Sequence, residues 1–269
     1  MKIICVALLV LLASCSTGSD SNKNTDSLIN SAVNSENDSS NTCQSINQGM
    51  QETGVIDYGL DFKTWLKNNS YSDIAASKGW GGGDSVCATV LKTPVVFIHG
   101  NGENSDVFAD MKNQFMSEGG YTSCELYAIT YLGADASNNY LNGNKAAWIR
   151  RFITAVLQYT GSEKVDIIAW SIGVPMARLA ITGGTVYTDA NRSVSCEMGG
   201  SINSKIRTFV GLAGASYGSP VCGTWEVNAN NLNLCGANGL SVNSPALVSI
   251  NGGVLGQATN PAPGINAYS

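Results

Sequence analysis

Short, continuous apolar runs alternate with amphipathic segments through the middle of the chain. The apolar runs have the composition of strands buried on both faces, and they lie at residues 94–98, 124–131, 165–169 and 206–212. Apolar residues at helical spacing fill the intervals at residues 105–118, 146–159 and 172–182. Because strands and helices alternate, the pattern predicts an α/β fold with a mostly parallel sheet, right-handed crossovers and helices on both faces.

Helix signals and loop composition refine this outline. Ser105 or Asp106 is expected to cap the first of these helices, and Gly161 is expected to end the second. Residues 213–264 are rich in Gly and Asn and have neither helical nor strand periodicity. We therefore expect that segment to form a loop region near a site rather than another regular layer.

The N-terminal residues have the features of a targeting segment. Lys2 precedes an apolar core at residues 3–12, which at about 10 residues is too short to cross a bilayer. The following Leu-Ala-Ser-Cys resembles the lipobox of bacterial lipoproteins, which implies lipidation at Cys15 and a membrane anchor there. The alternative is an ordinary secretory signal cleaved near Ala13 or Ser14.

Composition divides the chain into three parts. Residues 1–15 are the predicted lipoprotein signal peptide. Residues 16–45 are mostly Ser, Asn, Asp and Thr, which predicts a disordered polar linker. Residues 46–269 have the length of one globular domain. We expect an exported protein whose domain is tethered to a membrane or secreted.

Charge and cysteine usage narrow the class of partner. The net charge of −5 argues against a nucleic-acid partner, which requires a basic face. Six of the eight cysteines follow the predicted anchor, which suggests up to three disulfides in an exported chain. Cys222 and Cys235 enclose a short polar loop and are the expected pair. A metal site is disfavoured because the chain has no Cys-x-x-Cys and one histidine, and no organic cofactor is predicted.

Ser171 lies where the apolar run at 165–169 meets the predicted helix at 172–182. Ala169 and Gly173 flank it two positions away on each side, where a sharp strand-to-helix turn leaves no room for bulk. Such a turn, called a nucleophile elbow, projects the serine hydroxyl beyond the carboxyl end of the strand, where parallel α/β sheets bind ligands. Ala169 departs from the first glycine of G-x-S-x-G, but a methyl group is tolerable there.

Two backbone N–H groups are candidates for holding a negatively charged oxygen beside Ser171. The Ile172 amide lies at the start of the predicted helix, where the helix dipole is positive. The Asn101 amide lies in the glycine-rich stretch 99–102 that follows the apolar run at 94–98. Together these donors would form an oxyanion hole.

Each motif also has a purely structural interpretation. A serine before a helix is most often only an N-cap, and His-Gly after a strand is often only a turn. Both motifs occur here in the right order, each directly after an apolar strand, and this combination indicates acyl-transfer chemistry. A phosphate loop and a dinucleotide fold are disfavoured because neither glycine fingerprint is present.

Three runs, at residues 94–104, 165–175 and 209–215, resemble the class 2 lipases of the α/β-hydrolase fold, and the resemblance extends from Tyr71 to the last residue. The related extracellular poly(3-hydroxybutyrate) depolymerases share the His-Gly-Asn-Gly stretch and an Ala-x-Ser-x-Gly elbow. The resemblance implies that Ser171 is the nucleophile of a lipase or esterase and that Ile172 and Asn101 are its oxyanion donors. The expected substrate is a lipid ester or, alternatively, a polyester.

The acid and base of a serine hydrolase are missing from this pattern. In α/β-hydrolases they follow the serine in the order acid, then histidine, yet no histidine follows Ser171 and His99 lies upstream. The only later carboxylates, Asp189, Glu197 and Glu226, lie in predicted loops. We therefore expect the C-terminal part of the hydrolase to be absent and this chain to be almost inactive. The alternative is a non-catalytic lipid-binding lipoprotein.

Overall fold

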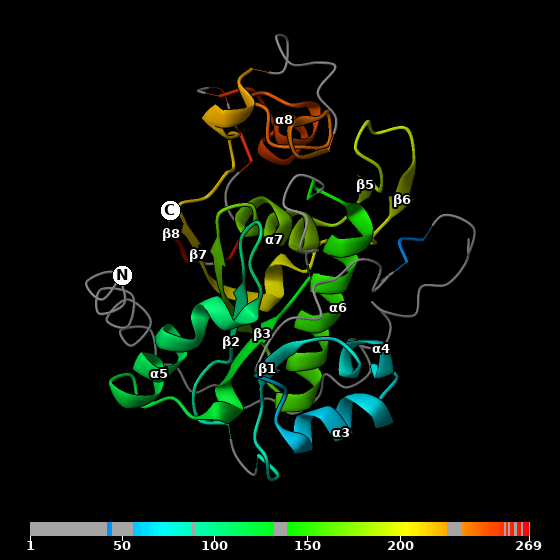
Figure 1. Ribbon diagram of the computed structural model, residues 1–269. Coiled ribbons are helices and arrows are strands. Elements are labelled where there is room, and N and C mark those ends of the chain that lie inside the picture. Colours follow the sequence, from blue (N-terminus) through cyan, green and yellow to red (C-terminus); the bar gives the residue numbers. More distant parts are fainter. Residues whose placement is uncertain are drawn as a thin grey trace.

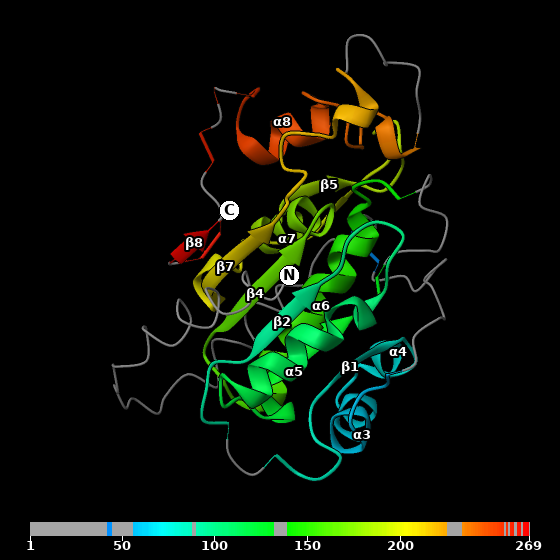
Figure 2. The same ribbon diagram turned by 60° about the vertical axis from the view of Figure 1, so that its left-hand side comes forward.

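The computed structural model describes residues 42–44, 56–87, 90–131, 139–224, 233–255, 257, 259–260, 263–264 and 266–268. The predicted signal peptide, its Cys15 and nearly all of the predicted linker lie outside these ranges, as does Glu226. Within them, a twisted main sheet runs through the molecule with helices on both sides (Figures 1 and 2).

The main sheet has six strands in the order β1-β3-β2-β4-β7-β8. They are β1 (Gly79–Gly81), β2 (Val95–Ile98), β3 (Leu126–Ile129), β4 (Val165–Trp170), β7 (Ile206–Leu212) and β8 (Asn266–Tyr268). All neighbouring pairs are parallel except β1 and β3, which are antiparallel. The predicted α/β fold with a mostly parallel sheet is confirmed, and the four predicted strands are β2, β3, β4 and β7. The apolar pattern did not predict β1.

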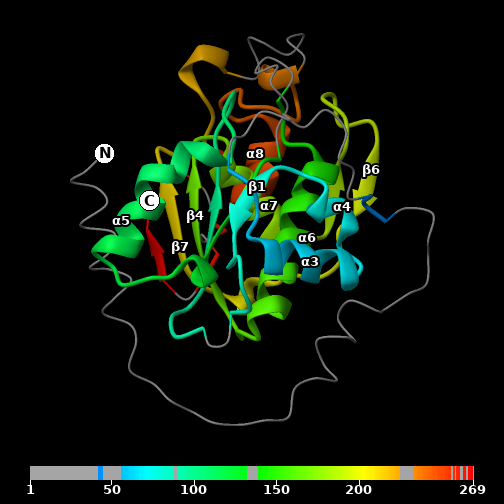
Figure 3. The ribbon, with the colours of Figure 1, turned by 60° about the horizontal axis from the view of Figure 1, so that its bottom comes forward.

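Alternate side chains of the strands enter two separate cores. One core packs β-strand side chains such as Val96, Ile98 and Ile167 against helices α3 (Leu60–Asn68), α4 (Ser72–Ala75), α6 (Gly143–Thr160) and α7 (Gly173–Thr182). The other packs Val95, Phe97 and Ile168 against α5 (Ala109–Ser117) and Trp80. Figure 3 shows α5 on one side of the sheet, opposite α3 and α6. The expected coverage of both faces is confirmed.

Two predicted helix starts are wrong by a few residues. The first helix begins as a 3₁₀ turn at Ser105–Phe108, and its cap is Asn104, whose side chain accepts from the Asp106 amide. The second, α6, begins at Gly143 because the Asn142 side chain accepts from two amides of its first turn. Gly161 ends α6 in the left-handed conformation, as predicted.

The segment after β7 lies over the carboxyl ends of the strands (Figures 1 and 2). Its described residues contain 3₁₀ turns and one short helix, α8 (Pro245–Asn251), before β8. Buried Arg178 on α7 holds this segment in place by donating to the Asn251 side chain and to the Ile250 and Asn260 carbonyls. The segment is therefore a cap over the end of the sheet where Ser171 lies.

Three disulfides join the six cysteines that follow Cys15: Cys43–Cys196, Cys87–Cys124 and Cys222–Cys235. Cys43 lies in the predicted linker. The predicted Cys222–Cys235 pair is confirmed. Cys43–Cys196 connects residues 42–44 to a separate hairpin of β5 (Thr185–Tyr187) and β6 (Ser195–Glu197). Disulfides of this number fit an exported protein. Among the described residues, no helix combines the length and the apolar character needed to cross a membrane.

Asp166 on β4 and Arg207 on β7 form an ion pair inside the sheet region. The carboxylate is fully buried, the guanidinium is 16% exposed, and Arg207 Nε lies 2.9 Å from Asp166 Oδ1. Burial raises the pKa of Asp166, while the hydrogen bonds and charge of Arg207 oppose that rise. The ion pair therefore stabilises a charged carboxylate in a strand whose other buried side chains are apolar.

Replacement Arg207→Met should destabilise the fold because it leaves the buried Asp166 carboxylate without its cation. We expect the free energy of unfolding at pH 7 to fall by about 3 kcal/mol in urea titrations followed by circular dichroism. Adding Asp166→Asn to that variant should restore part of the loss. A loss below about 1 kcal/mol, the value for an exposed pair, would contradict this role.

Candidate active site

Ser171 occupies the turn between β4 and α7 with a backbone φ of 56°. A non-glycine residue in this left-handed region costs about 1–2 kcal/mol, so the surrounding structure must hold it there. The side chain is partly exposed beyond the end of β4. This is the geometry expected of a nucleophile elbow, and it follows the predicted strand and precedes the predicted helix.

The turn is held against the end of β2 at very short range. A Cβ on Gly173 would lie 2.5 Å from the His99 carbonyl oxygen and 2.6 Å from that of Ile98. A Cβ on Gly100 would lie 3.0 Å from the Ser171 Cβ. Ala169 is fully buried at the first flanking position, so its methyl group is accommodated there. The small residues around Ser171 are therefore required by packing.

Backbone hydrogen bonds from the end of β7 hold the other side of the elbow. The Ser171 amide donates to the Leu212 carbonyl at 2.9 Å, and the Ala215 amide donates to the Ser171 carbonyl at 3.2 Å. The loop that starts at residue 213 thus supports the strained residue directly. This contact explains why the run at 209–215 accompanies the elbow in the sequence.

The predicted oxyanion donors lie at the ends of neighbouring strands. Ile172 is the N-cap residue of α7, and its amide has no hydrogen-bond acceptor within the described part of the chain. Asn101 lies in the turn after β2, and Ile98 pairs with Ala169 in the sheet. The sheet therefore brings the Asn101 turn and the start of α7 to the same edge.

Asn101 is held by residues that the sequence analysis did not single out. The buried Asn139 side chain donates to Asn101 Oδ1 at 2.8 Å, and Lys145 Nζ lies 3.5 Å from Asn139 Oδ1. Burial lowers the pKa of Lys145. These residues come from a loop and from the first turn of α6, so neither periodicity nor a motif could have indicated them.

His99 is fully buried, and its ring is hydrogen-bonded to backbone groups. Its Nε2 accepts from the Tyr131 amide at 3.2 Å, and Nδ1 lies 2.8 Å from the Gly100 carbonyl, which places the ring proton on Nδ1. Burial, together with the charge of Lys145, lowers the pKa of His99 to about 4 despite the Gly100 hydrogen bond. Both ring nitrogens are therefore occupied in positioning the ends of β2 and β3, and neither is available to deprotonate Ser171.

Of the carboxylates that follow Ser171, the two that the structure describes are also engaged elsewhere. Asp189 accepts from the Ser193 and Val194 amides, and these bonds outweigh burial and lower its pKa. Glu197 accepts from Thr185 across the β5–β6 hairpin. Among the described residues, nothing is hydrogen-bonded to the Ser171 hydroxyl, and no group of three His, Cys, Asp or Glu side chains could hold a metal ion.

Comparison with known proteins assigns the chain to a family. The sequence model of a family described as "Lipase (class 2)" matches residues 92–258, which include the Asn101 turn, the Ser171 elbow and the β7 loop. The chain belongs to the class 2 lipase family. The α/β-hydrolase fold expected from the resemblance follows from this membership, and the mostly parallel sheet agrees with it.

Solved structures similar to this member of the class 2 lipase family include three lipolytic proteins. A mature lipase of Bacillus licheniformis is 19% identical over 52% of this chain and 48% of that protein, with a TM-score of 0.37. Lipase B of Aspergillus fumigatus is 14% identical over 50% of this chain and 28% of that protein, with a TM-score of 0.36. A phospholipase of Legionella pneumophila is 16% identical over 61% of this chain and 35% of that protein, with a TM-score of 0.39. The chain thus spans less than half of each.

Ser171→Gly should stabilise the protein relative to Ser171→Ala. Glycine adopts the left-handed conformation without the Cβ penalty, although it loses more entropy on folding than alanine does. We expect a difference of about 0.5–1 kcal/mol in the free energy of unfolding, measured by urea titration of the two variants. Equal stability, or a more stable alanine variant, would show that the turn is not strained at this residue.

The single histidine makes the state of His99 directly measurable. Its folded pKa of about 4 lies below the ordinary value of 6.5, so the unfolded chain binds the proton first as pH falls. The contribution of the neutral ring to the free energy of unfolding, about 3 kcal/mol, is fully present above pH 6.5. It is lost as the pH falls towards 4. Nitrogen NMR of the imidazole should show a neutral ring with Nδ1–H at pH 6. A ring half-protonated at that pH would contradict the assignment.

Proposed function

We propose that this protein hydrolyses carboxylic esters with Ser171 as its nucleophile. The observation that carries the proposal is the partly exposed serine held at a φ of 56° beside the Ile172 amide, which has no acceptor among the described residues. Attack by Ser171 Oγ on the ester carbonyl forms a tetrahedral intermediate, whose oxyanion accepts from the Ile172 and Asn101 amides. The alcohol then leaves, and water hydrolyses the acyl-enzyme to release the acid. No metal or cofactor takes part.

The substrate proposed is a lipid ester, which membership of a lipase family supports. A polyester such as polyhydroxybutyrate would use the same chemistry and is the alternative. We further propose that residues 1–15 are a lipoprotein signal and that Cys15 carries the membrane anchor. Residues 16–45 would then be the tether of a domain that starts at residue 46, and the three disulfides support export.

We expect the chain of residues 1–269 to hydrolyse esters slowly. His99 is occupied by Tyr131 and Gly100, and the sequence contains no second histidine. Proton removal from Ser171 therefore falls to solvent or to an added base. The oxyanion donors and substrate binding still accelerate the reaction, by about 10³- to 10⁴-fold over water when triad groups are lacking.

Added imidazole should restore part of this missing base function. We expect imidazole to increase hydrolysis of p-nitrophenyl butyrate by the wild-type chain well beyond its direct reaction with the ester. Ser171→Ala should show only that direct reaction.

Two outcomes would contradict the proposal. Identical rates for wild type and Ser171→Ala, with and without imidazole, would favour a non-catalytic lipid-binding lipoprotein. Fast turnover without imidazole that Ser171→Ala abolishes would instead show that a group within the chain serves as the base.

A further inference from the structure

A hollow of about 380 Å³ lies at the opposite end of the molecule from Ser171. Its lining comes from α3, from Tyr159 near the end of α6, and from the loop that contains Val86 and Cys87. Helix α6 ends just before β4 begins, whereas Ser171 follows the other end of β4. Figure 1 shows α3 and the cap segment around α8 at opposite ends of the sheet. The hollow is thus separate from the proposed ester site.

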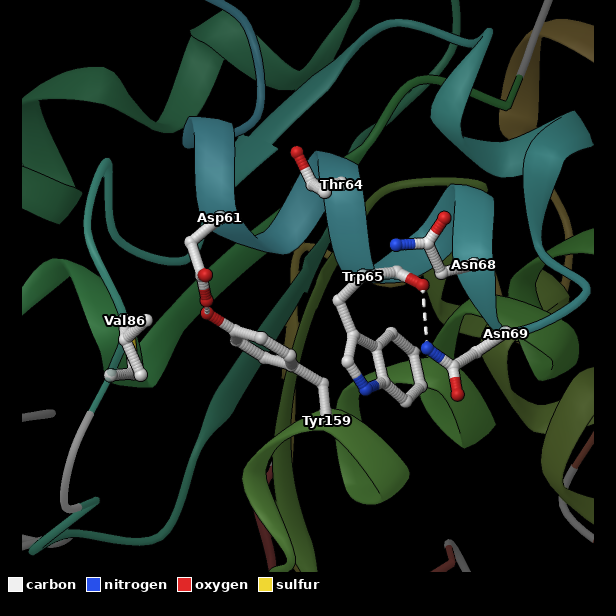
Figure 4. Close-up of a pocket in the computed structure, with 8 residues that line it drawn as sticks. Asp61, Thr64, Trp65, Asn68, Asn69, Val86 and Tyr159 are labelled. Atoms are coloured by element: carbon white, nitrogen blue, oxygen red, sulfur yellow. Dashed lines mark hydrogen bonds between the residues drawn. The ribbon is translucent and has the colours of Figure 1, made fainter.

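Two aromatic rings form a corner in this hollow. The Trp65 indole and the Tyr159 ring have centroids 5.5 Å apart and planes inclined by 62°. Both side chains are partly exposed, and Figure 4 shows Trp65 between Tyr159 and Asn69. Tyr71 stacks on Trp65 and holds the indole in position. Val86, which is 75% exposed, adds an apolar edge. Such a corner offers a rigid apolar surface to one face of a ligand.

The polar groups around the corner offer both acceptors and donors of hydrogen bonds. Asn69 Nδ2 already donates to the Trp65 carbonyl at 2.8 Å, and Thr64 Oγ1 donates to the Leu60 carbonyl at 2.7 Å. The Tyr159 hydroxyl donates to Asp61 Oδ2 at 2.6 Å. These three bonds leave the Asn69 and Asp61 oxygens and the Thr64 lone pairs as acceptors for a ligand. The second N–H of Asn69 and the Trp65 indole N–H, which has no acceptor among the described residues, are left as donors. The exposed Asn68 can both donate and accept.

This lining selects among ligand classes. Asp61 is the only charged residue among those that line the hollow, so an anion such as phosphate is disfavoured. A polyester or acyl chain offers no hydroxyl donors to the acceptors around the rim. A sugar ring matches both features, because it has a C–H face that packs on aromatic rings and hydroxyl groups that donate at its edge.

We propose that the hollow around Trp65 and Tyr159 binds neutral carbohydrate. The site would attach an exported protein to a polysaccharide surface while leaving the Ser171 end directed away from it. The inference does not depend on ester hydrolysis. Because the hollow is shallow and the contacts are few, we expect a Kd above about 0.1 mM for each site.

Saturation-transfer NMR on the full chain with cellohexaose, maltohexaose and chitohexaose tests the proposal. At least one of them should bind, and Trp65→Ala should weaken that binding by about tenfold. Asn68→Ala should also weaken it, and this exposed position provides a variant that folds if removal of Trp65 disturbs α3. The matched control is Asn113→Ala, an exposed asparagine on α5 at the other face of the sheet, which should leave binding unchanged. Ser171→Ala should bind like wild type.

Three results would overturn the proposal. The first is that none of the three oligosaccharides binds. The second is that binding is unchanged in both Trp65→Ala and Asn68→Ala. The third is that choline chloride binds in their place, which would make the hollow an aromatic site for a cation next to Asp61.

Discussion

The close approach of the β4–α7 turn to the end of β2 is the constraint on which the candidate site depends. Gly173 rests against the carbonyl groups of Ile98 and His99, where any side chain would collide with the backbone. This contact, together with the hydrogen bonds from Leu212 and Ala215, holds Ser171 in a conformation that its own preferences disfavour. The strain is offset by the packed ends of three neighbouring strands, and the result is a partly exposed serine beyond the end of β4.

Buried polar residues set the relative positions of these strand ends. His99 receives the Tyr131 amide and contacts its own neighbour Gly100, so its ring joins β2 to the end of β3. Asn139 fixes the Asn101 side chain in the same region. A histidine that in sequence stands beside a catalytic motif thus has a structural role. Both of its ring nitrogens are hydrogen-bonded to backbone groups, so neither is available to a substrate.

Much of the framework could be predicted from the sequence, because the central strands are continuous apolar runs and the elbow joins one of them to a helix. The left-handed turn at Ser171 and the Cys222–Cys235 disulfide both occur where the sequence placed them. The catalytic roles of Ser171, Ile172 and Asn101 stay predictions. Asn139 and Lys145 could not be identified from the sequence, because they act through single long-range hydrogen bonds that leave no periodic signal. Strand β1 was missed for another reason. Its Gly-Trp-Gly is too short to show a pattern, and it is a strand because it pairs with β3.

The Cys43–Cys196 disulfide has a mechanical consequence. It joins residues that are 153 positions apart, and it does so at the β5–β6 hairpin rather than in the main sheet. A pull at residue 43 passes through this covalent bond to β6, so it cannot stretch the loop of chain that contains β1 to β4 and the Ser171 elbow while the bond is intact. Beyond Cys196 the covalent path leads to β7 and the loop from residue 213. Force therefore reaches the elbow only through non-covalent contacts, such as the hydrogen bonds of Leu212 and Ala215 with Ser171.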